Sequence, residues 1–426
     1  MSAPTTTPPT AVRSTIVPPV KWRAPGFMIF FTLVSLFGFV LFTESGTTTF
    51  RTATGGELAE IPNTEIPTVA GLWVLTLVMA AVTVYSVMRA VQRQSLSWWP
   101  ATTFGIAFVL AFLVWVGAGA TIPLTSLLTG GLALSVPLVF GALSGVMCER
   151  AGVINIAIEG QLLGGAFLAA VVASVTANAY IGVLAAPIAG ALVGVLLVFF
   201  SVKYWVDQII VGVVLNVLVL GLTSFFFSTV LSENPGLNSR QRLANLPVPL
   251  LSDIPVIGPV LFNQNILVYL MYAAVILLQI FLFRSRWGLR VRAVGEHPKA
   301  ADTVGINVIR TRWITPIMGG ALAGLGGAFF TVGSGLAFGR DMSAGNGFIA
   351  LAAMILGRWN PLGALAAALL FGFSRNLANM LSAMGGVGIP GEFLLMLPYV
   401  ITVFAVAGFV GRVRPPAAEN IPYIKS

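Results

Sequence analysis

The chain has 426 residues, of which 57% are apolar and only 9% are charged. Soluble proteins carry about 25% charged residues, so this chain lacks the polar side chains that would cover a water-exposed globule. The net charge of +9 does not indicate a nucleic-acid partner, because membrane proteins concentrate Lys and Arg in cytoplasmic loops. The single Cys148 and the single His297 exclude an internal disulfide and a His-rich metal site. The composition therefore indicates a polytopic helical membrane protein.

Apolar stretches of about twenty residues predict ten membrane spans. They lie at residues 27–43, 68–88, 98–117, 124–147, 157–176, 181–202, 207–231, 266–283, 313–335 and 393–411. The stretch 347–384 adds one or two more, because the sequence GRWNP at 357–361 leaves a first piece too short to cross a bilayer alone. We expect an all-α fold with about ten to twelve transmembrane helices.

The distribution of basic residues predicts the orientation of the chain. Segment 284–312 contains seven basic residues against two acidic ones, so we expect it in the cytoplasm together with the C-terminal tail at 412–426. The loop 44–67 contains four glutamates against one arginine and is expected outside the cell. This topology places the N-terminal tail, residues 1–26, in the cytoplasm.

The membrane-embedded part divides into two regions. Residues 27–117 form an additional N-terminal region, for which docking of a binding protein and simple anchoring are both open roles. Residues 118–411 form the transmembrane core, which contains the loop 284–312. No loop is long enough for a separate soluble domain, which usually needs about 50 residues.

A weak internal repeat lies within the core. The sequence GALSG at 141–145 resembles GALAG at 320–324, and NIAIEGQLLG at 155–164 resembles FIALAAMILG at 348–357. In the predicted topology the helices of the first pair run in opposite directions, as in transporters with inverted repeats. Chance recurrence of small residues in apolar helices is the alternative.

Polar residues interrupt apolar sequence at the junction of two predicted spans, in the segment 148–161. We expect Glu149 and Arg150 to form a solvated pair at the membrane interface. Asn155 and Glu159 are four residues apart, which predicts that they share one helical face. A charge well inside a membrane helix costs about 2.5–3.5 kcal/mol, and a substrate pathway is one reason to tolerate it. The structural alternative is that Glu159 lies shallow or caps a neighbouring backbone.

A second polar stripe comprises Gln208, Gly212 and Asn216, which recur every four residues in a helix of Ile, Val and Leu. Pathway lining and interhelical hydrogen bonding are both open for Asn216. Hydrogen bonding is favoured for Gln208, which lies close to the helix start. Farther along the chain, Arg375 is expected to form a structural pair, to reach the interface or to lie in the pathway.

The segment 287–307 predicts a short cytoplasmic helix. Pro298 suits the first turn of a helix and Gly305 can end it. Small residues such as Ala300 and Ala301 suit docking into a groove of a cytoplasmic partner. The alternative is an amphipathic loop on the lipid headgroups.

Three runs closely resemble ABC-importer permeases of the nucleoside and simple-sugar branch, which is related to the branched-chain amino acid and ribose permeases. They are ERAGVINIAIEGQLLGGAF at 149–167, GLRVRAVGEHPKAADTVGIN at 288–307 and FIALAAMILGRWNPLGALAAALLFG at 348–372. The resemblance covers about residues 124–411 and implies a type II-like importer fold.

The resemblance also implies the assembly. Such a permease works with a second permease subunit, often a different chain, on two cytoplasmic ATP-binding subunits, and an extracytoplasmic lipoprotein supplies the substrate. ATP and Mg would bind to the partner subunits, so this chain would have no cofactor, no metal and no catalytic residue.

Residue roles follow from the same resemblance. The sequence KAADTVG at 299–305 is similar to the motif that docks on the ATPase, which makes 296–305 the expected coupling helix. Its proposed coupling residues are Glu296, Pro298, Ala300, Ala301 and Gly305. The residues expected to line the substrate pathway are Asn155, Glu159 and Asn216.

These expectations describe a multi-pass permease of the bacterial inner membrane that moves nucleosides or related sugars inward by alternating access. The main alternative is an ion-coupled secondary transporter or channel that uses intramembrane carboxylates such as Glu159. An intramembrane enzyme is not expected, because the sequence has neither a His/Glu metal motif nor a nucleophile–base set.

Overall fold

The structure is a computed structural model, and it describes residues 22–43, 45–52, 61–384, 396 and 414–425. Ten helices in this part of the chain are long and apolar enough to cross a membrane. This result confirms the predicted all-α polytopic class. The helices belong to two compact units, Met1–Thr49 with Glu65–Ala120 and Phe50–Thr64 with Thr121–Ser426.

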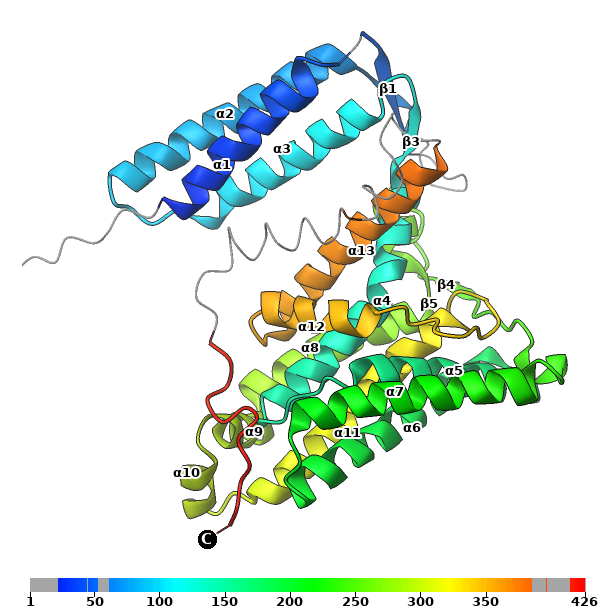
Figure 1. The fold of residues 1–426 in the computed structure, drawn as a ribbon. Coiled ribbons are helices and arrows are strands. Elements are labelled where there is room, and N and C mark those ends of the chain that lie inside the picture. Colours follow the sequence, from blue (N-terminus) through cyan, green and yellow to red (C-terminus); the bar gives the residue numbers. More distant parts are fainter. Residues whose placement is uncertain (1–21, 44, 53–60, 385–395, 397–413, 426) are drawn as a thin grey trace, which may run out of the picture. The chain divides into compact units, whose positions relative to one another are not determined.

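The first unit contains three apolar helices (Figure 1, blue to cyan). They are α1 (Arg23–Val34), which continues as the π-helical stretch η1 (Ser35–Val40), α2 (Thr68–Val91) and α3 (Trp98–Val116). Between α1 and α2 the chain forms the short strands β1 (Thr47–Arg51) and β2 (Thr64–Pro67). The hydroxyls of Ser35 and Thr76 lie 2.7 Å apart, which joins the first two helices by a buried hydrogen bond.

The second unit contains the remaining elements. In chain order they are β3 (Thr121–Pro123), α4 (Leu124–Glu149), α5 (Ile158–Thr176), α6 (Ala179–Val198), η2 (Phe199–Lys203), α7 (Gln208–Phe226), η3 (Phe227–Leu231), η4 (Pro235–Asn238), β4 (Asn245–Pro247), η5 (Gly258–Phe262), β5 (Asn263–Asn265), α8 (Ile266–Arg284), α9 (Arg286–Glu296), α10 (Pro298–Thr303), α11 (Val308–Gly327), η6 (Ala328–Phe330), α12 (Asn346–Leu356) and α13 (Pro361–Ala383). β4 and β5 pair antiparallel. Helix α4 is buried along most of its length and forms the centre of this unit.

The predicted spans agree with these helices to within a few residues, apart from the span 313–335, which is observed at Val308–Phe330. Helix α11 begins at Val308 rather than at residue 313, because the side chain of Asn307 accepts the backbone N–H of Arg310 and caps an earlier start. The interrupted stretch 347–384 consists of the short α12 and the long α13, as expected. The predicted span 393–411 lies outside the described residues apart from residue 396.

Helices α4 and α11 pack against each other in opposite directions. Gly319 of α11 lies against Ser144 and Cys148 of α4, whereas Gly326 lies against Phe140. Residue numbers therefore rise along one helix as they fall along the other. These are the two helices that carry the pair of sequences GALSG and GALAG.

The helices that follow α4 and α11 pack reciprocally. α4 contacts α12 and α13, while α11 contacts α5 and α6. Each central helix also contains a proline before its repeated glycine, Pro137 before Gly141 and Pro316 before Gly320. Each half thus packs its first helix against the second and third helices of the other half, which supports the predicted inverted repeat.

Glycines bring α6 and α11 into backbone contact. A Cβ atom on Gly190 would lie 2.0 Å from the carbonyl oxygen of Gly320, and one on Gly324 would lie 2.5 Å from that of Ala186. Close approach through small residues is a main source of helix association in lipid, where apolar side chains gain little by leaving their surroundings. The α6–α11 contact therefore depends on these glycines.

We predict that Gly324→Ala destabilises the protein by about 1–3 kcal/mol, because the added methyl group has to push two backbones apart. The matched control is Gly221→Ala in α7, where a Cβ atom meets nothing within 4 Å. That change should be neutral or slightly stabilising, since alanine favours a helix. Thermal unfolding in detergent measures both, and equal midpoints for the two variants would contradict the tight contact.

Candidate functional site

Glu159 lies in the first turn of α5 and caps the start of α12. Its Oε1 accepts the backbone N–H of Gly345 at 2.8 Å, and its Oε2 accepts that of Gly347 at 2.5 Å. A carboxylate at a helix N-terminus satisfies free amide donors and interacts favourably with the helix dipole. The capping alternative considered for Glu159 is therefore present, while its pathway role stays a prediction.

A second polar contact holds the start of α12 from another side. Nη1 of Arg375 in α13 donates to Oδ1 of Asn346 at 2.7 Å. The amide of Asn346 in turn donates to the carbonyl oxygen of Ser343 at 2.7 Å. Arg375 thus forms a structural pair, with an amide as its partner.

Two residues of the polar stripe on α7 bind the backbone that leads into α5. Oδ1 of Asn216 accepts the N–H of Gly160 at 2.8 Å, and its Nδ2 donates to the carbonyl oxygen of Ile156 at 2.9 Å. Oε1 of Gln208 accepts the N–H of Ile154 at 2.7 Å. These side chains provide hydrogen-bond partners for backbone N–H and C=O groups that have no partner within a regular helix.

Asn155 occupies a different environment. It is fully buried, and its Nδ2 donates to Ser144 Oγ at 3.0 Å and to Gln161 Oε1 at 2.9 Å. The prediction that Asn155 and Glu159 share a helical face is wrong, because α5 begins only at Ile158. The prediction required a continuous helix from residue 155 to residue 159, but the chain forms a turn at residues 156 and 157.

A cavity of about 280 Å³ brings Glu159 and Asn216 together. The residues that line it are Glu159, Gly160, Leu163, Val213, Asn216, Val217, Leu220, Asp341, Gly345 and Phe348. Asn155 is not among them, so its proposed role in the pathway has no support from this cavity. The wall combines carboxylate and amide groups with apolar side chains and the half-exposed ring of Phe348, a mixture typical of sites for small polar ligands.

Sequence reasoning missed Asp341 and the cavity-lining position of Phe348. Asp341 follows α11 and η6 in an irregular segment, and the sequence has no signal that this segment returns to the start of α5. The resemblance between 155–164 and 348–357 marked Phe348 only as part of a repeat. The packing of α12 against α4 and α5 places Phe348 beside Glu159, and Asp341 lies in the segment that leads into α12.

The basic end of the second unit, where α8 ends and α11 begins, contains the predicted coupling segment. Nδ1 of His297 accepts the N–H of Ala300 at 3.3 Å and caps α10, which has Pro298 at its first position. Gly305 follows the helix with φ +82°, a left-handed conformation that favours glycine. The short helix therefore has the predicted start and end.

The predicted range 296–305 needs one correction. Glu296 is the last residue of α9, so it belongs to the preceding helix and not to α10. His297 interrupts the helix because the residue before a proline disfavours the α-helical conformation. Of the alanines, Ala301 is buried with Val294 and Val308, whereas Ala300 is exposed.

Glu149 and Arg150 do not form the expected solvated pair. Glu149 is only 3% exposed, and it accepts a hydrogen bond from Nε1 of Trp359 at 2.5 Å. Arg150 donates through Nε to the carbonyl oxygen of Trp359 at 2.9 Å. Both residues hold the turn between α12 and α13, a contact between distant parts of the chain that the local sequence does not reveal.

The C-terminal residues 414–425 lie against the same basic end. The N–H of Ala418 donates to the carbonyl oxygen of Gly295 at 2.8 Å. Glu419 lies beside Glu149, and burial raises the pKa of Glu419, although its hydrogen bond with Glu149 lowers it. Burial against this end of the molecule therefore favours the protonated form of the Glu419 side chain.

Comparison with known proteins identifies the family. Residues 127–406 match the family described as the permease component of the branched-chain amino acid transport system. The guanosine ABC transporter permease protein NupQ of Bacillus subtilis is 38% identical over 69% of this chain and 95% of its own length. The nucleoside ABC transporter permease protein NupC of Lactococcus lactis is 40% identical over the same shares, 69% and 95%. No solved structure matches the chain.

A third relative widens the range of substrates named. The putative glucose ABC transporter permease protein TsgC13 of Haloferax volcanii is 32% identical over 63% of this chain and 84% of its own length. These relatives are transporter permease subunits and not enzymes. The family match extends over α4 to α13 and begins after the first unit. The chain therefore belongs to the branched-chain amino acid transport system permease family and is the permease component of an ABC importer, a multi-pass membrane protein.

Proposed function

We propose that this permease carries nucleosides or related simple sugars into the cell. The relatives named for guanosine and nucleoside transport are 38% and 40% identical to the chain, above the 32% of the relative named for glucose. The observation that carries the proposal is the cavity in which Glu159 and Asn216 meet Asp341 and Phe348.

The chemistry of the cavity suits a nucleoside. The carboxylates of Glu159 and Asp341 can accept hydrogen bonds from sugar hydroxyls, because a carboxylate has about four acceptor sites and Glu159 uses two of them for capping. The ring of Phe348 can contact the flat face of a base. A simple sugar offers the same hydroxyls without the base, so we place nucleosides first.

The coupling of transport to ATP would begin at α10. ATP with Mg would bind to two partner subunits at the basic end, and their closure would displace α10. Ala301 packs α10 against the ends of α9 and α11, and α11 contacts α5, which carries Glu159. A displacement of α10 would therefore reach the cavity through helices that contact one another, α11 and then α5.

We propose the rest of the assembly on the same basis. A second, different permease is supported by relatives that occur as pairs in one organism, NupQ with NupP in Bacillus subtilis and NupC with NupB in Lactococcus lactis. An extracytoplasmic lipoprotein would supply the substrate. The bacterial inner membrane would hold the complex, with the segment 284–312 and both tails, 1–26 and 412–426, in the cytoplasm and the loop 44–67 outside.

We predict that reconstituted vesicles take up labelled guanosine only when the ATP-binding partner subunits and ATP are present. An ABC permease has no other energy source, whereas an ion-coupled carrier would be driven by a gradient through a carboxylate such as Glu159. The measurement compares ATP, a non-hydrolysable ATP analogue and an ion gradient alone. Uptake driven by the gradient without ATPase partners would contradict the importer mechanism.

We predict that Asn216→Ala lowers ATP-driven guanosine uptake by about tenfold. The variant would lose the hydrogen bond between the Asn216 amide and the substrate, and one such bond contributes about 1 kcal/mol or more to binding. The matched control is Gln208→Ala, which removes a buried amide from the same face of α7 outside the cavity. The control should keep most of the uptake. Equal losses in both variants would indicate that Asn216 only supports the backbone.

We predict a similar loss for Glu159→Gln, because a glutamine has one carbonyl oxygen and no charge with which to cap α12 and bind a hydroxyl. Uptake in the same vesicles is the measurement. Full uptake in this variant would refute a role of the carboxylate in the pathway.

A further inference from the structure

A buried arginine makes two hydrogen bonds to the C-terminal segment 414–425. Arg312 of α11 is only 2% exposed. Its Nη1 donates to the carbonyl oxygen of Ile421 at 2.7 Å, and its Nη2 donates to that of Ala418 at 3.2 Å. A buried guanidinium is costly unless its donors are paired, and the tail supplies acceptors for Nη1 and Nη2, while Nε has no partner among the described residues. Arg312 and the segment 414–425 therefore stabilise each other's position.

Glycine makes room for this contact. Gly152, in the turn after α4, has φ +81°, and a Cβ atom there would lie 2.8 Å from Nη2 of Arg312 and 3.0 Å from the carbonyl oxygen of Ala418. Gly295, at the end of α9, would place a Cβ atom 2.2 Å from the carbonyl oxygen of Arg150. Three parts of the chain thus meet backbone to backbone around the arginine.

The same segment reaches the coupling helices. The N–H of Ala418 donates to the carbonyl oxygen of Gly295, and that of Ala417 donates to Oε2 of Glu296 at 3.4 Å. Farther on, Tyr423 packs against the buried cluster of Val294 in α9, Ala301 in α10 and Val308 in α11. The tail therefore contacts α9 and α10 while it is anchored to α11.

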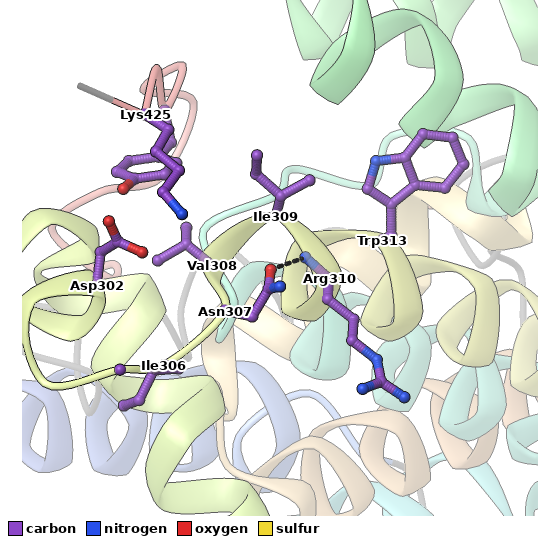
Figure 2. A pocket seen from close by; sticks show the side chains of 10 residues that line it. Asp302, Ile306, Asn307, Val308, Ile309, Arg310, Trp313 and Lys425 are labelled. Carbon is purple, nitrogen blue, oxygen red and sulfur yellow. Dashed lines mark hydrogen bonds between the residues drawn. The ribbon is translucent and has the colours of Figure 1, made fainter.

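Figure 2 shows the hollow beside this contact, with Asp302 on one side, Trp313 on the other and Lys425 of the tail above. The hollow has a volume of about 650 Å³, and α10, the start of α11 and the tail residues Tyr423 and Lys425 form its walls. The tail is thus part of the surface that surrounds the coupling helix.

We propose that Arg312 is a positioning residue for coupling: it clamps the tail 414–425 across α9 and α10 and so makes these helices move together with α11. The proposal rests on the proposed function. Without the clamp, α10 would keep its connection 304–307 to α11, the packing of Ala301 and its contacts with α9, but it would lose the link through the tail. Arg312 lines neither the cavity beside Glu159 nor the hollow of Figure 2, so its effect on transport would pass through the tail.

The first test measures the clamp itself. Amide hydrogen exchange on the full chain in detergent should be faster at residues 418–425 in Arg312→Gln than in the wild type. Arg312→Lys should lie between them, because one ammonium group keeps the charge but not the fork of two donors. The control Arg284→Gln removes an exposed charge from the same end of the molecule and should leave the exchange unchanged. Unchanged exchange in Arg312→Gln would overturn the proposal.

The second test measures coupling in vesicles that contain the ATP-binding subunits and the second permease. Arg312→Gln and a chain that ends at residue 413 should keep ATP hydrolysis but transport at least about threefold less guanosine per ATP, whereas Arg284→Gln should match the wild type. If Arg312→Gln does not fold, the shortened chain decides alone. Full transport per ATP after release of the tail would overturn the proposal. Failure of the wild type to transport guanosine would refute the proposed substrate, while the exchange result would still decide whether Arg312 holds the tail.

Discussion

The structure of the core depends on a carboxylate that satisfies backbone amides where a helix begins inside the bundle. Helix α12 (Asn346–Leu356) is too short to cross a membrane, so its free N–H groups cannot reach water at a membrane surface. Glu159, which lies in α5, accepts hydrogen bonds from two N–H groups at this helix start, those of Gly345 and Gly347. The cost of a charge in this position is thereby offset by donors that would otherwise be unpaired. The cavity lies beside this contact because the start of α12 and its capping residue are both lining groups.

The reciprocal packing of the two halves connects this contact with the basic end. α4 and α11 run antiparallel at the centre, and α11 reaches both α5 near the cavity and, at its other end, the tail held by Arg312. Close glycine contacts leave these helices little freedom to slide past one another. In the proposed coupling mechanism, a motion that starts at α10 would therefore be transmitted as a movement of packed helices.

The sequence predicted the elements well and the contacts between them poorly. Apolar runs, Pro298 and Gly305 located the spans and the short helix α10, because these signals act within a few residues. The partners of Glu149 and Arg312 were not predictable, since Trp359 and the C-terminal tail lie far away along the chain. The pairing of Asn155 with Glu159 failed for a related reason: periodicity applies only inside a helix, and the chain enters α5 after Asn155.

The most direct test of the central claim is protection of the cavity by its substrate. In a chain in which the buried Cys148 is replaced by serine, a single cysteine is placed either at Val217, which lines the cavity, or at its exposed neighbour Leu218, which does not. The rate of labelling by a small thiol reagent is then measured in the reconstituted importer with and without guanosine. Guanosine should slow the labelling at residue 217 and leave residue 218 unchanged. Equal rates at residue 217 with and without guanosine would contradict the account of this cavity as the nucleoside pathway.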